Sequence, residues 1–204
     1  MAVATIGDNR MKARPSIVVL SGEPDSGKTT ICARVVALAR ARGLEVAGVL
    51  TPPRLAGGCK VGLDVEEIRT GQRRPLAEGI GPTDGPATER WCFHPDGLAW
   101  GTEILCLATP CDLLVIDELG PLELVRNQGW TIGFDLLRAS RYRLALVVVR
   151  TALLSRFRER LGGVEPLILA VTATNRDALP GEIVALLEPY LAQMPSAFRK
   201  ARKR

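Results

Sequence analysis

The amino-acid sequence predicts an α/β fold: a three-layer, doubly wound and mostly parallel sheet in a single domain of 204 residues. Short β-branched runs alternate with longer segments whose apolar residues recur at helical spacing, which is typical of a parallel sheet with helices on both faces. The chain is 47% hydrophobic but only 4% aromatic, which predicts an aliphatic core. We expect this core to span about 16–192, with a basic tail at 195–204.

The first half of the chain contains two predicted strands and one helix before its pattern changes. A buried strand is expected at 16–20, a helix at 29–42 and a second strand at 45–50. From Thr51 to about Gly85, glycines and prolines punctuate short alternating runs. This pattern predicts a β-hairpin insertion over the sheet edge, with a mobile loop from Gly79 to Ala87.

The second half returns to a regular alternation of strand and helix. Asp96 is expected to cap a helix that reaches about Ala108. A longer helix is expected at 124–139, interrupted by glycine near Gly129 and Gly133. The remaining strands are expected at 113–116, 143–149 and 167–171, and the remaining helices at 152–161 and 179–192.

Composition narrows the class of protein. The five cysteines form no CxxC pair and the chain has one histidine, which argues against a zinc module and a disulfide framework and favours reduced thiols in a cytoplasmic protein. Apolar runs are strand-length, so we expect no membrane partner. Part of the +5 net charge lies in the basic tail, but the scarcity of aromatic residues disfavours nucleic-acid binding.

A glycine-rich segment joins the first predicted strand to the first predicted helix. It matches the phosphate-binding pattern G-x-x-x-x-G-K-[ST] at every fixed position. The glycines let backbone N–H groups surround phosphate oxygens, and the helix start adds its positive dipole end. We expect Lys28 to reach the β- and γ-phosphates of a nucleoside triphosphate, and the Thr29 hydroxyl to bind Mg²⁺. The expected nucleotide-binding residues of this segment are Gly22, Glu23, Pro24, Asp25, Ser26, Gly27, Lys28, Thr29 and Thr30.

Two carboxylates follow the apolar strand expected at 113–116. Asp117 occupies the place of the acid that holds the metal in P-loop proteins. Glu118 follows it and is expected to act as a general base toward water, although a surface acid at a strand end is the alternative interpretation. The insertion after Thr51 separates the phosphate loop from the Asp117–Glu118 pair along the chain, so the strands that precede these two motifs are not consecutive in the sequence. This favours a RecA-like P-loop NTPase fold, in which an additional strand lies between those two strands.

Four segments together resemble the P-loop nucleoside triphosphatase family first described from thermophiles and represented in animals by the cancer-related nucleoside triphosphatase. The similarity covers roughly Ile17 to Leu191, and its family-specific parts are the Asp-Glu-x-Gly-x-x-Glu run and the late Asn-Arg pair. It implies Mg²⁺-dependent hydrolysis of ATP, GTP and other nucleoside triphosphates with loose base preference. The four segments are 22–30, 51–65, 115–124 (VIDELGPLEL) and 175–177 (NRD).

The resemblance also implies roles for individual residues. Glu123 matches the family's second glutamate, which either orients the catalytic loop or stabilises a helix dipole. Asn175 and Arg176 follow the last predicted strand, where they contact base or ribose; helix capping by Asn175 or Asp177 is the alternative. The other implied roles agree with the motifs: Lys28 and Glu118 as catalytic residues, Thr29 and Asp117 as metal ligands.

Two features depart from the family pattern. Asp25, together with Glu23, places acid in the phosphate loop, and a carboxylate facing a triphosphate would weaken binding. We therefore expect Asp25 to point to solvent. The arginine that the family carries in the loop after Thr51 does not align cleanly, because Arg54 is slightly displaced.

Two rival functions share the same motifs. A small-molecule or nucleotide kinase would use the same phosphate loop, with Arg150, Arg156, Arg158 and Arg160 as a lid or, equally, as a solvated helix face. A nucleotide-switched binding protein would use the hairpin and the tail as contact surfaces. The adjacent Asp117 and Glu118 favour water over an acceptor hydroxyl, and hence a hydrolase.

Overall fold

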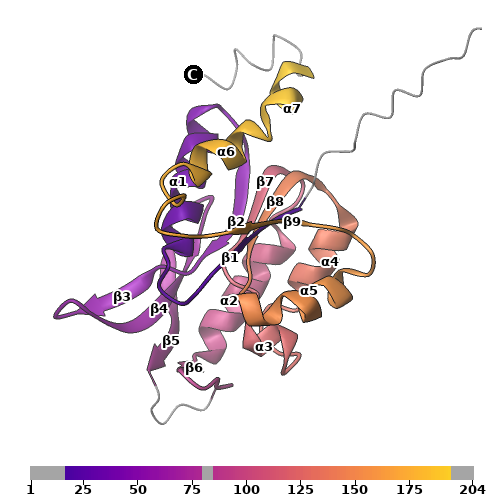
Figure 1. Ribbon diagram of the computed structural model, residues 1–204. Helices are drawn as coiled ribbons and strands as arrows, with labels where there is room; N and C mark the ends of the chain where they lie inside the picture. The colour runs from indigo at the N-terminus through magenta and orange to yellow at the C-terminus, as the bar shows by residue number, and fades with distance from the viewer. Residues whose placement is uncertain (1–16, 80–84, 194–204) are drawn as a thin grey trace, which may run out of the picture.

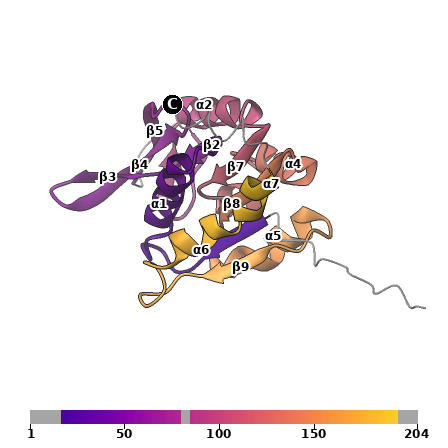
Figure 2. The same ribbon diagram turned by 90° about the horizontal axis from the view of Figure 1, so that it is seen from above.

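A nine-stranded mixed sheet forms the middle layer of the protein, with helices on both of its faces (Figures 1 and 2). The computed structural model describes residues 17–79 and 85–193. The strand order is β6-β5-β4-β2-β7-β8-β1-β9, and β3 pairs with β4 alone. The strands are β1 (Ile17–Ser21), β2 (Val46–Leu50), β3 (Pro53–Ala56), β4 (Cys59–Glu67), β5 (Arg73–Gly79), β6 (Trp91–Phe93), β7 (Cys111–Ile116), β8 (Tyr142–Val148) and β9 (Leu167–Ala170).

Five of the strands run parallel and form the half of the sheet that carries the motifs. β1 pairs with β8 and β9, and β7 pairs with β8 and β2, all in parallel. β8 therefore lies between the strand that precedes the phosphate loop and the strand that precedes Asp117. The expected additional strand is confirmed, and so is the doubly wound α/β architecture.

Two hydrophobic cores hold the layers together, one on each face of the sheet. In β1, Ile17 and Val19 belong to one core, whereas Val18 and Leu20 belong to the other, because successive side chains of a strand point to opposite faces. The first core is covered by α2, α4 and α5, and the second by α1 and α6. The helices are α1 (Lys28–Ala41), α2 (Pro95–Cys106), α3 (Pro121–Leu124), α4 (Ile132–Ala139), α5 (Leu154–Leu161), α6 (Leu179–Ala185), α7 (Glu188–Gln193) and the 3₁₀ helix η1 (Thr151–Leu153).

Three predicted helices are shorter or more broken than the sequence suggested. The helix expected at 124–139 is two helices, α3 and α4, because Asn127 and Gly129 between them adopt left-handed backbone conformations. The helix expected at 152–161 opens with η1 before α5. The helix expected at 179–192 is divided into α6 and α7, and Pro189 lies in the first turn of α7, where its missing N–H costs nothing.

The expected Asp96 cap is wrong. Helix α2 begins at Pro95, and the residue before it, His94, has the extended backbone of a cap position. Proline suits the first helical position because its φ is already close to the helical value. Asp96 lies within the first turn instead, where its negative charge complements the positive end of the helix.

The expected insertion extends the sheet rather than lying over its edge. β4 pairs antiparallel with β2 and with β5, and β5 pairs with β6, a short strand that the sequence did not predict. The β3–β4 hairpin projects beyond the helical layers, as Figure 2 shows. Residues 80–84 of the loop expected to be mobile and the basic tail at 195–204 lie outside the described residues.

Within residues 17–79 and 85–193, no helix combines the length and the apolar character that crossing a bilayer requires.

Gly48 in β2 allows β2 and β7 to pair closely. Its φ is +111°, and a Cβ there would lie 1.9 Å from the carbonyl oxygen of Val115. We expect Gly48→Ala to lower the free energy of unfolding by at least about 3 kcal/mol, through backbone strain and displacement of β7. Gly181→Ala in α6 is the matched control, because a Cβ there meets nothing within 4 Å. It should stabilise the protein by about 0.5–1 kcal/mol. Denaturant unfolding measures both, and equal effects of the two variants would contradict this account.

Candidate functional site

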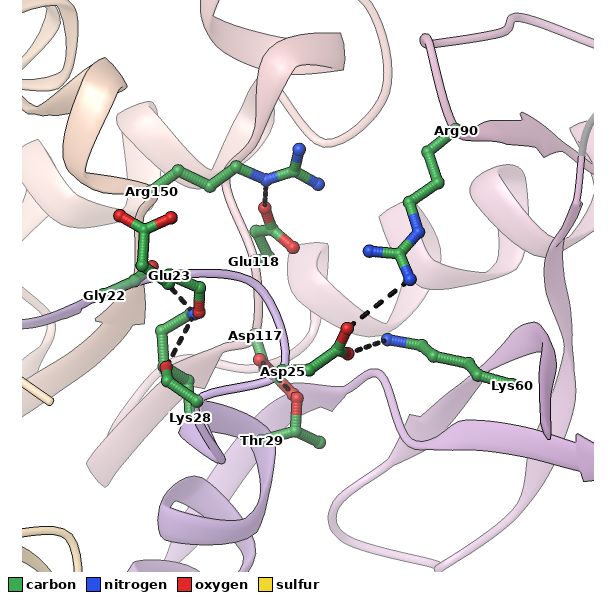
Figure 3. A network of polar contacts seen from close by, with 11 residues as sticks. Gly22, Glu23, Asp25, Lys28, Thr29, Lys60, Arg90, Asp117, Glu118 and Arg150 are labelled. Carbon is green, nitrogen blue, oxygen red and sulfur yellow. Dashed lines mark hydrogen bonds and ion pairs between the residues drawn. The ribbon is translucent and has the colours of Figure 1, made fainter. Parts of the chain in front are cut away.

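The phosphate loop connects β1 to α1 and is held by its own lysine. Gly27 adopts φ +94°, which lets the loop turn directly into the helix that begins at Lys28. The Lys28 Nζ donates to the carbonyl oxygens of Gly22 (2.9 Å) and Glu23 (2.5 Å) and to Ser26 Oγ (3.1 Å) (Figure 3). Burial lowers the pKa of the Lys28 ammonium from its ordinary value. The loop thus curls around a buried ammonium group, which supplies positive charge where an anion would bind.

Asp117 lies directly after β7 and reaches the phosphate loop. Its Oδ1 accepts from the Thr29 hydroxyl at 3.3 Å, and its Oδ2 accepts from the Thr51 backbone N–H at 3.0 Å. The side chain is almost completely buried, and this burial raises the pKa of Asp117 to about 6, although both hydrogen bonds oppose the rise. The structure brings together the hydroxyl and the carboxylate that the sequence assigned to one metal, and oxygen donors of this kind are what Mg²⁺ takes.

Glu118 is fixed by an arginine that sequence reasoning placed elsewhere. The Arg150 Nε donates to Glu118 Oε1 at 2.6 Å (Figure 3). Arg150 lies two residues after the end of β8 and so stands at the same edge of the sheet as Glu118, which lies two residues after the end of β7. From the sequence alone, Arg150 was one of four arginines that could form the lid of a kinase or a solvated helix face. Its position at the carboxyl end of a predicted parallel strand was the signal for a role in the site.

Asp25 makes contacts that the sequence did not predict. Its side chain is 57% exposed, in keeping with the expectation, yet it pairs with Lys60 Nζ at 3.3 Å and with Arg90 Nη2 at 3.4 Å. These ion pairs outweigh partial burial and lower the pKa of Asp25. They join the phosphate loop to β4 and to the segment before β6, as Figure 3 shows, so the insertion supplies two cations to the site.

Glu123 acts on the loop that follows Glu118. Its Oε2 accepts from the Gly120 N–H at 2.9 Å, and its Oε1 accepts from the Trp130 N–H at 3.0 Å. These bonds tie the start of α3 to the segment before α4. The geometry favours loop orientation, one of the two roles left open for Glu123, although the same residue also stands in the first turn of α3.

Asn175 and Arg176 lie in the turn after β9. The Asn175 side chain accepts from the Thr172 N–H at 2.8 Å and donates to the Ala170 carbonyl at 2.8 Å, so it closes this turn. Helix α6 has no side-chain cap, and Asp177 pairs instead with Arg34 of α1 at 2.9 Å. Arg176 is exposed. Base or ribose contact by Asn175 and Arg176 stays a prediction.

Arg54 does not take part in the site. It lies on β3 and pairs with Glu78 at 2.7 Å and with Asp64 at 3.8 Å. These contacts connect β3, β4 and β5 to one another, so its observed role is to hold the insertion together.

One pocket is lined by most of the predicted site residues and by the two cations of the insertion, whereas Gly22, Glu23 and Ser26 of the phosphate loop do not line it. It measures about 870 Å³ including the solvent at its mouth. Neither Asn175 nor Arg176 is among its lining residues. The charged lining residues, together with the threonine expected to bind the metal, are Asp25, Lys28, Thr29, Lys60, Arg90, Asp117, Glu118 and Arg150.

The model of a family described as NTPase matches residues 17–184. The chain belongs to the NTPase family. The nucleoside-triphosphatase THEP1 of Thermofilum pendens is 30% identical over 177 residues, which cover 86% of this chain and 97% of that protein. Its counterpart in Methanosarcina acetivorans is 31% identical over 170 residues, 81% of this chain and 93% of the relative. The resemblance inferred from the motifs is confirmed.

Solved structures of NTPase-family proteins share the fold. THEP1 from the hyperthermophile Aquifex aeolicus superimposes with a TM-score of 0.65 at 19% identity, over 84% of this chain and 99% of that one. The solution structure of a human cancer-related nucleoside triphosphatase gives 0.62 at 24% identity, over 84% of this chain and 97% of that one. The expected RecA-like P-loop fold is therefore confirmed.

Burial of Glu123 makes stability depend on pH. Burial raises the pKa of this carboxyl from 4.5 to about 7, so the folded protein retains a proton that the unfolded chain releases across that interval. The contribution of this protonated carboxyl to the free energy of unfolding is complete below about pH 4.5 and is lost as the pH rises through 7. Between pH 4.5 and 8, the wild type should lose about 3 kcal/mol of unfolding free energy relative to Glu123→Gln. Urea unfolding of both proteins across this range tests it, and parallel pH curves would contradict it.

Proposed function

We propose that this NTPase-family protein is a Mg²⁺-dependent enzyme that hydrolyses ATP, GTP and other nucleoside triphosphates to the diphosphate and phosphate. The observation that carries the proposal is the convergence of Lys28, Thr29, Asp117 and Glu118 on one pocket at the carboxyl edge of the parallel strands. Family membership and the names of the relatives support the reaction. None of the five cysteines is paired in a disulfide in the described residues, which supports the cytoplasmic location that we include in this proposal.

The residues around Asp117 suit Mg²⁺. A hydroxyl, Thr29 Oγ1, lies 3.3 Å from a carboxylate oxygen, Asp117 Oδ1. Mg²⁺ is commonly held by one or two such groups together with substrate phosphates and water. When bound, it supplies positive charge to the β- and γ-phosphate oxygens. The Thr51 N–H occupies the other oxygen of Asp117 and fixes the direction in which the carboxylate faces the loop.

The chain's own residues account for positioning and proton transfer. Lys28 would exchange its bonds to the loop carbonyls for bonds to the β- and γ-phosphate oxygens, which lie where the loop N–H groups converge. The Glu118 carboxylate takes the proton of a water molecule as the water oxygen bonds to the γ-phosphorus and the bond to the diphosphate oxygen breaks. Arg150 holds Glu118 in place and adds positive charge at this end of the pocket.

Separate replacement of the adjacent carboxylates Glu118 and Asp117 distinguishes the role of general base from the role of metal ligand. Glu118→Gln keeps the shape of the side chain but removes the base, so kcat should fall by about 10²–10⁴ while triphosphate binding is nearly unchanged. Asp117→Asn should lower Mg²⁺ affinity as well as turnover. Phosphate release and nucleotide titrations with ATP and GTP, each at several Mg²⁺ concentrations, distinguish the two. Full phosphate release by the Gln variant would refute Glu118 as the base.

Asp25 places a negative charge near the expected phosphate position. Asp25→Asn removes that charge and leaves Lys60 and Arg90 without their carboxylate partner. We expect KM for ATP to fall by about 3- to 10-fold at low salt and much less at high salt, because screening weakens such charge effects.

The control for this experiment is Glu89→Gln, an exposed acid beside Arg90 that does not line the pocket. It should leave KM unchanged. A higher KM in Asp25→Asn would mean instead that Asp25 is needed to position the two cations.

A further inference from the structure

A second, mainly apolar cavity adjoins the phosphate pocket on the side of Glu118. It measures about 460 Å³ including the solvent at its mouth. The two cavities meet at a common boundary, which consists of Thr51, Leu63, Trp91, Glu118 and Arg150. None of the residues of the phosphate loop lines the second cavity. A molecule in it would therefore approach Glu118 without displacing a triphosphate from the loop.

The lining of this cavity selects for a neutral apolar occupant. Its inner wall consists of apolar and aromatic side chains, among them Leu76, Phe93, Leu98, Leu122 and Trp130. The carboxylate of Glu123 is also part of the lining, but both of its oxygens accept backbone N–H bonds. Glu118 pairs with Arg150 at the boundary, so neither of these charges is left unpaired for an occupant. A charged group of either sign would also lose its hydration against the apolar wall.

The wall formed by Trp130 is fixed before anything binds. Its indole Nε1–H donates to the Leu98 carbonyl at 3.1 Å, and its backbone N–H donates to Glu123. Gly101 packs against the ring so closely that a Cβ there would lie 2.5 Å from it. Helix α2 thus holds the indole ring, and Glu123 of α3 holds the backbone of Trp130. A cavity shaped in advance and lined by aromatic rings is typical of a small-molecule site.

We propose that this cavity binds a small neutral molecule with an aromatic or branched apolar body and one hydroxyl, and that this hydroxyl receives the γ-phosphoryl group. The inference rests on the proposed role of Glu118 as the base. The apolar body would occupy the inner wall, and the hydroxyl would lie at the boundary beside Glu118 and Arg150, where water lies during hydrolysis. The protein would then act as a kinase toward such an alcohol.

The transfer step has the same balance as hydrolysis with the alcohol in place of water. The hydroxyl oxygen bonds to the γ-phosphorus, and the bond from that phosphorus to the diphosphate oxygen breaks. The hydroxyl proton moves to the Glu118 carboxylate. The products are a phosphate monoester of the alcohol and the nucleoside diphosphate, and no oxidant or reductant takes part.

Benzyl alcohol is a suitable probe, because two of the three tryptophans, Trp91 and Trp130, line the cavity. Titration of the full-length protein should change tryptophan fluorescence with saturation. Leu98→Phe fills the cavity and should raise the Kd by at least about tenfold. Leu107→Phe is the matched control, because Leu107 is 73% exposed at the end of the same helix, α2, and does not line the cavity. It should bind as the wild type does.

Leu98→Ala tests the site in the opposite direction, by enlarging it. This variant should bind 2-naphthylmethanol more tightly than the wild type does. Unsaturable fluorescence changes, or equal affinities in the wild type and Leu98→Phe, would overturn the site. Competition between ADP and benzyl alcohol would also overturn it, because it would mean that part of the nucleotide occupies the cavity.

The transfer is measured with ATP labelled on the γ-phosphate. Benzyl phosphate should form at the expense of inorganic phosphate in the wild type, and Leu98→Phe should lose at least about nine-tenths of the ester while it continues to release phosphate. Saturable binding without ester would refute the transfer. Failure of the proposed hydrolysis is recognised separately, as absence of phosphate release from ATP when no alcohol is added.

Discussion

The parallel register of β1, β8, β7 and β2 is the constraint on which the site depends. Parallel strands end at the same edge of a sheet, so the residues that follow them converge although they are far apart in sequence. The phosphate loop follows β1, Arg150 follows β8, Asp117 and Glu118 follow β7, and Thr51 follows β2. A shift of β7 relative to its neighbours would separate Asp117 from both Thr29 and Thr51. The close approach of β2 to β7 at Gly48 helps to fix that register.

Burial of Lys28 and Asp117 at the carboxyl edge of the sheet costs free energy of solvation, and their hydrogen-bond partners offset this cost only in part. Burial lowers the pKa of Lys28 and raises that of Asp117, which means that the protein disfavours both charged forms in isolation. A triphosphate and a divalent cation would supply counter-charges to these two groups. Glu118 and Asp25 already have arginine or lysine partners within the chain. The site thus combines two buried groups, Lys28 and Asp117, whose charges a ligand would stabilise, with two carboxylates, Glu118 and Asp25, that already form ion pairs within the chain.

The insertion completes the site from the opposite side. β4 continues the sheet beyond β2, which carries Lys60, Leu63 and the following strands over the region of Glu118. Lys60 and Arg90 add positive charge facing the phosphate loop, and Trp91 stands between the phosphate pocket and the apolar cavity. The parallel core supplies the phosphate and metal groups, and the insertion determines what else can approach them.

The sequence by itself determined the parts of this protein that rest on local spacing. The loop from Gly22 to Thr29, the Asp117–Glu118 pair after an apolar run and the alternation of strands and helices each follow from residues close together in the chain, where backbone geometry leaves few options. The same local reasoning expected an interruption near Gly129 but not the complete separation into α3 and α4, since apolar spacing alone does not reveal the left-handed backbone of Asn127.

Only the tertiary structure decided which distant side chains meet. Glu118 and Arg150 are 32 residues apart, and Asp25 and Arg90 are 65 apart, so their contacts depend on strand order and on the path of the insertion. The apolar cavity likewise collects side chains from β4, β5, β6, α2 and α3. The sequence shows which charged and apolar residues are available for such contacts. Which of these residues meet depends on the register of the strands and the packing of both cores. Those are long-range properties that no local pattern specifies.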